Sequence, residues 1–142
     1  MIRYFDASAL AKRYLQEEHS DVVNRLLVQG LSTTSRISEA ELASALARRH
    51  REGRLSKEQR DQFISSMERD MGSLYVIEVS PEVSSQACRL LVNHVLRAAD
   101  ALHLASALML ARRAEKGVQF IAFDKHLNNA ARLEGLEVPQ FD

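Results

Sequence analysis

The chain is organised around the segment Leu96-Arg97-Ala98-Ala99-Asp100-Ala101-Leu102-His103-Leu104-Ala105-Ser106-Ala107-Leu108-Met109. Eleven of the fourteen residues from 98 to 111 are apolar, and the three exceptions, Asp100, His103 and Ser106, recur at every third position. A helix with this pattern is buried on nearly every side and polar along one narrow stripe. We therefore expect a central helix that holds a carboxylate, Asp100, in its first turn.

Length and composition predict one compact domain over residues 1–142. Hydrophobic residues make up 46% of the chain and charged residues 27%, as in ordinary globular proteins. A chain of this length can bury about two-thirds of its unfolded surface. No apolar run approaches membrane-spanning length, and no secretory signal follows Met1. We therefore expect no membrane association and a cytoplasmic protein.

The charge balance gives little indication of a partner. The 19 Lys and Arg residues equal the 19 Asp and Glu residues, so bulk basicity does not indicate nucleic-acid binding. Arginine, whose planar guanidinium suits phosphate, nevertheless supplies 15 of the 19 basic residues. Four of them, Arg48, Arg49, Arg51 and Arg54, crowd the end of one predicted helix. Cations there usually offset the helix dipole, so we interpret them as a solvated face, with nucleic-acid contact as the alternative.

Four β-prone runs alternate with helix-forming segments along the chain. The runs are Ile2–Phe5, Leu31–Ile37, Leu74–Val79 and Val118–Phe123, with Leu136–Pro139 as a candidate short fifth strand. Strands that alternate with helices form right-handed crossovers and a parallel sheet covered on both faces. The expected fold class is α/β, with a doubly wound parallel sheet of about four to five strands flanked by helices.

Several helix boundaries are marked by capping signals. Ser38 with Glu41 and Ser56 with Gln59 match capping boxes, Ser80 is followed by a proline suited to the first helical position, and Asp124 is placed to cap a helix. The helix after Ser80 is expected to bury an apolar face of Val83, Ala87, Leu90, Leu91 and Val95. Cys88 is the only cysteine, which excludes an internal disulfide, and its helical spacing predicts a small buried side chain.

Four acidic residues stand at strand-to-helix junctions or in early helical turns: Asp6, Glu41, Asp100 and Asp124. A carboxylate at a helix N-terminus accepts backbone N–H bonds and meets the positive end of the dipole, which stabilises a helix by about 0.3 to 1 kcal/mol. Taken singly, capping is the better interpretation for Glu41 and Asp124. It fits Asp100 less well, because a lone carboxylate among apolar residues is costly.

The expected topology changes the interpretation of these acids. The carboxyl ends of parallel strands share one edge of the sheet, and ligands bind there at the point where the strand order reverses. All four carboxylates can meet at that edge. Like charges a few ångströms apart raise one another's pKa unless a cation compensates. A cluster of four carboxylates therefore indicates a divalent-metal site, and all-oxygen ligands favour Mg²⁺ or Mn²⁺ over zinc.

At these residues the sequence resembles the PIN-domain ribonucleases, most closely the VapC-type toxins of bacterial toxin–antitoxin pairs. The resemblance spans nearly the whole chain, and its most specific part is the run around Asp100. It rests on four segments in the right order: Phe5-Asp6-Ala7-Ser8-Ala9, residues 38–46, Leu96-Arg97-Ala98-Ala99-Asp100-Ala101-Leu102-His103-Leu104-Ala105 and Phe123-Asp124-Lys125-His126-Leu127.

The resemblance implies an acidic metal-binding set of Asp6, Glu41, Asp100 and Asp124, with Ser8 as a nearby hydroxyl. It also implies Mg²⁺-dependent (or Mn²⁺-dependent) hydrolysis of RNA phosphodiesters in a single PIN-like domain, a small protein antitoxin that occludes the site, and commonly a homodimer. This sequence departs from the family at Ala122, where members often carry Thr or Ser.

Four further interpretations follow from the residues. Arg97 is a candidate phosphate ligand because Asp100 lies one turn away, whereas His103 is interpreted as a hydrogen-bonded, partly buried histidine rather than a metal ligand. A phosphoacceptor signalling domain also gathers acids and Mg²⁺ at strand ends. A non-catalytic protein-interaction domain would keep the acids only as helix caps.

Overall fold

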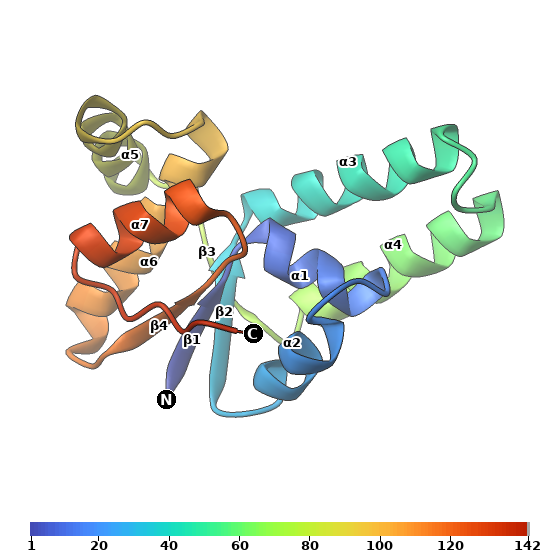
Figure 1. Cartoon of the computed structure of the whole chain (residues 1–142), viewed down its shortest axis with the longest axis horizontal. Helices are drawn as coiled ribbons and strands as arrows, with labels where there is room; N and C mark the ends of the chain where they lie inside the picture. Colours follow the sequence, from blue (N-terminus) through green and yellow to red (C-terminus); the bar gives the residue numbers. More distant parts are fainter. Residues whose placement is uncertain (142) are drawn as a thin grey trace.

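The centre of the structure is strand β1 (Ile2–Phe5), which pairs in parallel with β2 (Leu31–Ser35) on one side and with β4 (Val118–Ile121) on the other. Strand β3 (Tyr75–Ile77) pairs with β2 at the edge, giving the strand order β3-β2-β1-β4. This computed structural model describes residues 1–141 (Figure 1). The predicted parallel α/β sheet is confirmed, with each of the four β-prone runs forming a strand.

Helices cover both faces of the sheet, and their sides follow from the strand order. In Figure 1, α1 to α4 lie on one side and α5 to α7 on the other, while α3 and α4 form a long hairpin that projects away from the sheet. Within residues 1–141 the helices are α1 (Ala7–Tyr14), α2 (Ser20–Leu27), α3 (Ile37–Arg51), α4 (Lys57–Met71), α5 (Pro81–Asn93), α6 (Ala98–Ala114) and α7 (Lys125–Leu133).

Successive side chains of the inner strands point to opposite faces of the sheet and pack into two separate cores. Tyr4 and Phe120 point to the face covered by α5, α6 and α7, where their rings stack with centroids 5.6 Å apart. Phe5 and Ile121 point to the opposite face and pack with residues from α1 to α4. Each of these fully buried large side chains contributes about 1.5 to 3 kcal/mol through burial. The strands are therefore fixed in register by two cores at once.

Helix α6 is the predicted central helix, and its polar stripe is buried rather than facing water. His103 is 1% exposed and Ser106 is fully buried, with its hydroxyl donating to the Leu102 carbonyl at 2.8 Å. Asp100 lies in the first turn, as predicted. Although α6 is so apolar, no helix in the part of the chain that the structure describes is both long and apolar enough to cross a membrane.

The candidate fifth strand forms only one parallel bridge. Glu137 pairs with Gln119 beside β4, where the Phe120 N–H donates to the Glu137 carbonyl at 2.8 Å. The chain then reaches Pro139, which has no N–H to continue a ladder. Strand β2 is also shorter than expected, because α3 already begins at Ile37.

Three of the predicted caps are confirmed and one is wrong. Ser56 forms a capping box with Gln59, Ser80 caps α5, and Asp124 caps α7. The capping box expected at Ser38 does not form, because α3 starts before it and Ser38 lies inside the first turn. Its buried hydroxyl instead meets the Thr34 hydroxyl at 2.7 Å.

The apolar face predicted for α5 is correct only in part. Val83, Ala87 and Leu90 are buried, but Cys88 is exposed, contrary to prediction. Cys88 follows Ala87 by one residue, which turns it about 100° away from the buried stripe. Leu91 is also exposed, and Val95 lies beyond the end of the helix, where it is 95% exposed.

The end of β2 is held to β1 by a side chain, and we expect this link to be measurable. Thr34 donates to the Phe5 carbonyl at 2.7 Å and also contacts Ser38. Replacing it with isosteric valine, Thr34→Val, leaves buried polar atoms without this partner. The free energy of unfolding in urea is expected to fall by about 1 to 3 kcal/mol. Removing the exposed hydroxyl of α3 in Ser44→Ala serves as the control, with a change within about 0.5 kcal/mol.

Candidate active site

The candidate site lies where the direction of the crossovers changes, at the carboxyl ends of β1 and β4. From β1 the chain builds outward to β2 and β3 through α1 to α4, and it returns to β4 through α5 and α6 on the other face. Asp6 follows β1 and Asp124 comes shortly after β4. The Asp6 N–H donates to the Ile121 carbonyl at 3.1 Å, which joins the two strand ends. Such a switch point is the usual place for a ligand in an open parallel sheet.

Asp6 is the most enclosed of the four predicted acids, at 4% exposure. Its carboxylate accepts the Ala9 N–H at 2.9 Å, so it caps α1, and it accepts the Ser8 hydroxyl at 2.8 and 2.9 Å. Burial raises the pKa of Asp6 to about 6, the charge of Asp100 adds to the rise, and His103, Ala9 and Ser8 oppose it. The structure thus holds this carboxyl in one orientation at an electrostatic cost.

Asp100 differs from an ordinary helix cap. It stands in the first turn of α6, where Arg97 is the N-terminal cap residue and no side chain makes a capping bond. Its pKa is raised by burial first, and then by the negative charges of Asp124 and Glu41. His103 and Arg97 lower it. The charge of Asp100 in turn raises the pKa of Asp6. Asp100 therefore links all four acids electrostatically.

Glu41 does not cap α3, contrary to the simplest interpretation of its position. It lies in the second turn, and its side chain is 35% exposed. Its Oε1 accepts a hydrogen bond from Nε2 of His103 at 2.6 Å, across to α6. Asp124, which is exposed, does cap its helix and accepts the Leu127 N–H at 2.9 Å.

The donor set fits a divalent cation by its chemistry. Hard cations prefer carboxylate oxygens, and a positive charge would offset the repulsion that raises the pKa of Asp6 and of Asp100. Asp6, Glu41, Asp100 and Asp124 are the residues that would hold it. Across residues 1–141, no group of three or more histidine, cysteine, aspartate or glutamate side chains is arranged closely enough to hold a metal ion.

A groove of about 520 Å³ lies between α1 and α3, and Glu41 is the member of the four acids that lines it. Ser8 and Glu41 line it, together with four cationic residues: Lys12, Arg48, Arg49 and Arg97. Glu17 lies 3.7 Å from Lys12 and 3.0 Å from Arg49, so these two cations are paired. Arg48 and Arg97 are exposed and make no ion pair within the described part of the chain. The exposure of Arg48 agrees with its interpretation as part of a solvated face, and its place on the groove is compatible with the alternative of nucleic-acid contact.

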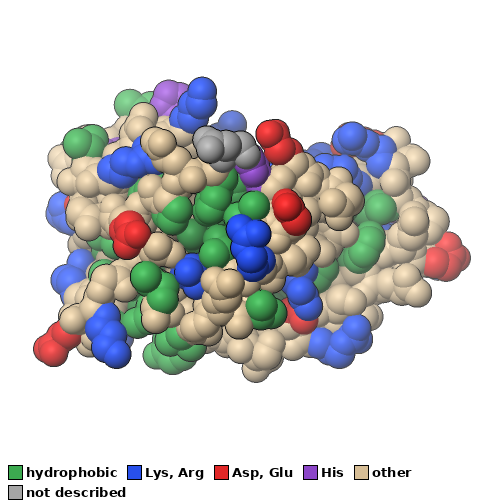
Figure 2. Space-filling view, turned by 60° about the horizontal axis from the view of Figure 1, so that its bottom comes forward, with side chains coloured by type: hydrophobic (Ala, Val, Ile, Leu, Met, Phe, Trp, Pro, Cys, Tyr) green, Lys and Arg blue, Asp and Glu red, His purple; other side chains and the backbone are tan. Residues whose placement is uncertain are grey.

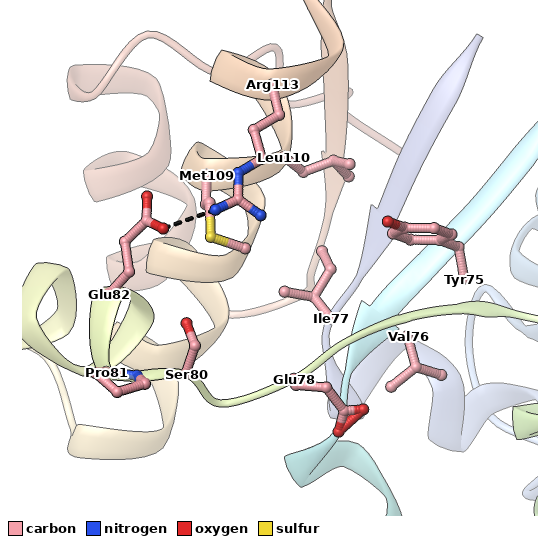
Figure 3. A pocket seen from close by; sticks show the side chains of 10 residues that line it. All are labelled: Tyr75, Val76, Ile77, Glu78, Ser80, Pro81, Glu82, Met109, Leu110 and Arg113. Carbon is pink, nitrogen blue, oxygen red and sulfur yellow. Dashed lines mark hydrogen bonds and ion pairs between the residues drawn. The ribbon is translucent and has the colours of Figure 1, made fainter.

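A second groove, of about 510 Å³, lies elsewhere, along the edge strand β3 (Figure 3). None of the four acids lines it, and Glu82 crosses it to pair with Arg113 at 2.7 Å. On the face shown in Figure 2, basic and acidic side chains are interspersed with apolar ones. Unlike the groove along β3, the groove between α1 and α3 is lined by one of the four acids, Glu41, and by two arginines without an ion pair among residues 1–141, Arg48 and Arg97.

The hydrogen-bonded His103 predicted from the sequence is confirmed, but its two partners were not predicted. His103 contacts Glu41 through one ring nitrogen and the Tyr4 hydroxyl through the other, at 2.7 Å. The periodic position of His103 after Asp100 was the available signal, but its partners are 62 and 99 residues away. Ala122, where family members often carry a hydroxyl, is buried in the core shared with α6 and α7.

Comparison with known proteins agrees with this geometry. The PIN domain family model matches residues 3–133. Ribonuclease VapC45 of Mycobacterium tuberculosis is 31% identical over 140 residues, covering 95% of this chain and 92% of that protein. The crystal structure of M. tuberculosis VapC20, a sarcin–ricin loop cleaving toxin, has a TM-score of 0.67 at 20% identity, with 90% of this chain and 94% of that chain covered.

A further solved structure, VapBC2 from Rickettsia felis bound to a DNA fragment from its promoter, has a TM-score of 0.68 at 15% identity and covers both chains completely. At these identities the two structures establish the fold alone. The family match and the 31% identical relative go further. The chain belongs to the PIN-domain family, among the proteins of VapC type.

The raised pKa of Asp6 predicts an unusual pH dependence of stability. Because the folded-state pKa, about 6, lies above the ordinary value of 3.8, ionised Asp6 opposes folding at neutral pH. This cost disappears as the pH falls through 6 toward 4. We therefore compare the free energy of unfolding of metal-free Asp6→Asn with that of metal-free wild type. The difference between the two proteins is expected to be more favourable to the variant at pH 7.5 than at pH 4.5, by up to about 3 kcal/mol. Urea unfolding of both proteins at the two pH values measures this change. If the variant and wild type differ by the same free energy at both pH values, the prediction is contradicted.

Proposed function

We propose that this chain is a divalent-metal-dependent endoribonuclease that hydrolyses RNA phosphodiester bonds as the toxin of a toxin–antitoxin pair, with Mg²⁺ or Mn²⁺ as the cofactor. The observation that supports the proposal is electrostatic: the charges of Asp124 and Glu41 act on Asp100, and the charge of Asp100 acts on Asp6, although the four acids come from four different parts of the chain. The relatives named as VapC ribonucleases support the nuclease activity.

The residues divide the chemistry among themselves. Asp6 is buried and held by Ser8 and Ala9, so it offers a carboxylate in a fixed direction. Asp100 comes from the rigid central helix, and Glu41 and Asp124 complete the set from α3 and the start of α7. A bound divalent cation supplies Lewis-acid polarisation of the scissile phosphate and lowers the pKa of water. No covalent bond to the protein is required.

The groove beside the acids supports a polyanionic substrate. Arg48 and Arg97 extend from its two sides without carboxylate partners among residues 1–141, and a planar guanidinium matches phosphate oxygens. Setting aside the four acids leaves 15 acidic against 19 basic residues, from 19 of each in the whole chain. A zero formal charge is therefore compatible with attraction of RNA to this groove.

The geometry disfavours the two alternatives. A phosphoacceptor aspartate must be reachable by a phosphodonor, whereas Asp6 is 4% exposed and its oxygens are hydrogen-bonded. A non-catalytic domain would keep the acids as caps, and Asp6 and Asp124 do cap helices. Asp100 and Glu41 make no capping bond, however, so capping leaves the two acids of α6 and α3 without a role.

The partner assignments rest on relatives. One structural neighbour is a toxin–antitoxin complex from Klebsiella pneumoniae, with a TM-score of 0.62 at 14% identity, covering 87% of this chain and 88% of that one. On this basis a small protein antitoxin is the proposed partner of this chain. A homodimer is the further proposal, and the molar mass in solution, against 16.0 kDa for one chain, tests it.

Loss of one carboxylate from the central helix is expected to remove activity and keep the fold. Asp100→Asn preserves the size of the side chain and removes the carboxyl group, whose pKa is raised in the folded protein. Cleavage of RNA in Mg²⁺ should fall by more than about 100-fold, since even outer groups of metal sites contribute about 10–100-fold. Thermal unfolding of the metal-free variant should occur at or above the wild-type temperature. Near-normal turnover, or wild-type cleavage in excess chelator, would contradict the metal mechanism.

The groove predicts a distinct effect for one arginine of α3. Arg48→Gln is expected to raise KM for RNA several-fold at low salt and to leave kcat nearly unchanged, because its contact is with phosphate and not with the reacting bond. The salt slope of binding should fall by about 0.7 for one lost contact to a single strand. Arg51→Gln is the matched control, since Arg51 belongs to the same helix but does not line the groove. Equal effects of the two variants would mean that the arginines only attract RNA through their overall positive charge, and would contradict a specific contact of Arg48 in the groove.

A further inference from the structure

His103 is an unusually constrained side chain for a position outside the acidic set. It comes from the middle of α6, is 1% exposed, and uses both ring nitrogens. Nε2 lies 2.6 Å from Oε1 of Glu41, and Nδ1 lies 2.7 Å from the Tyr4 hydroxyl. The Tyr4 ring meets the imidazole edge-on, with centroids 5.9 Å apart. The chain Tyr4–His103–Glu41 therefore links the sheet interior to the groove.

The proton positions in this chain follow from its end groups. A carboxylate only accepts hydrogen bonds, so the nitrogen facing Glu41 is the one that carries a proton. At the other end of the chain, a tyrosine hydroxyl carries a proton at neutral pH, because the ordinary pKa of tyrosine is about 10. Tyr4 therefore keeps its proton and can donate it to Nδ1. The resulting ring has one defined tautomer and one defined orientation.

The consequence for Glu41 is a fixed direction in place of a freely rotating side chain. Glu41 is the longest of the four acidic side chains and is only partly covered, at 35% exposure. Alone, such a side chain would lose rotamer entropy on holding any one geometry. His103 holds Oε1, and so leaves Oε2 as the oxygen available to the groove.

We propose that His103 is a positioning residue that orients Glu41 toward a divalent cation, and that Tyr4 in turn orients His103. This inference rests on the proposed metal-dependent function and adds to it a residue that does not contact the cation. This role also explains why the polar stripe of α6 continues past Asp100 into the interior. His103, the next residue of the stripe, holds Glu41 by a hydrogen bond.

The test measures Mn²⁺ binding to the unloaded protein, by titration calorimetry or electron paramagnetic resonance, separately from RNA cleavage. His103→Phe keeps a planar ring and removes both nitrogens, and it is expected to weaken Mn²⁺ binding by about 10- to 100-fold. His103→Gln, which retains an N–H donor, should recover part of that loss. Wild-type affinity in His103→Phe would overturn the positioning role.

A double-mutant cycle distinguishes action through Glu41 from a general loss of structure. If His103 acts by orienting Glu41, the variant Glu41→Gln/His103→Phe should bind Mn²⁺ no more weakly than Glu41→Gln alone. Losses that multiply would overturn the proposal. Should His103→Phe not fold, Tyr4→Phe tests the same chain, with an expected loss of about 3- to 10-fold, and unchanged affinity in that variant would count against the role.

Thr33→Val is the matched control. Thr33 is fully buried and donates to the Arg3 carbonyl at 3.0 Å, so the variant loses a buried hydrogen bond of similar kind without touching the acids. Its Mn²⁺ affinity should equal that of wild type, and a loss as large as that of His103→Phe would overturn the specific role. If the wild-type protein binds no Mn²⁺, the proposed function itself is overturned. If wild type binds Mn²⁺ and the His103 variants bind it with the same affinity, only this inference is overturned.

Discussion

The interior position of β1 is the constraint on which the rest of the molecule depends. Because β1 has a hydrogen-bonded neighbour on each side and a helical layer on each face, its successive residues have no choice of environment. Tyr4 must enter one core and Phe5 the other, and Asp6 emerges where the ladder ends. A shift of register by one residue would exchange the two cores and move the carboxyl away from the switch point.

The acidic site is held together against its own electrostatics. Burial and mutual repulsion raise the pKa of Asp6 and of Asp100, so their ionised forms oppose folding. The Ala9 N–H, the Ser8 hydroxyl and the charge of Arg97 offset part of this cost. Two large apolar cores supply the remaining stability. Concentrated charge of one sign at the edge of a well-packed sheet is typical of sites kept for function.

The buried chain from Tyr4 through His103 joins the two roles of the central helix. The apolar residues of α6 fix its position in the core, and its His103 connects Tyr4 in that core to Glu41 on the groove. Packing and site geometry therefore share the same element. A small displacement of α6 would change both the distance to Glu41 and the stacking around Tyr4.

The sequence by itself determined the parallel α/β fold, the central helix, the caps at Ser56, Ser80 and Asp124, and the four acids that the family pattern marks. These are local properties of spacing and residue type, or motifs read in order. It did not determine where α3 begins, since Thr34 binds Ser38 and removes it from capping. It also failed for Cys88, because one helical step separates a buried side from an exposed one. The Tyr4–His103–Glu41 chain and the place of Arg48 on the groove were decided only by the tertiary structure, since their partners lie far apart in the chain and meet through the packing of α3 and α6 around one sheet.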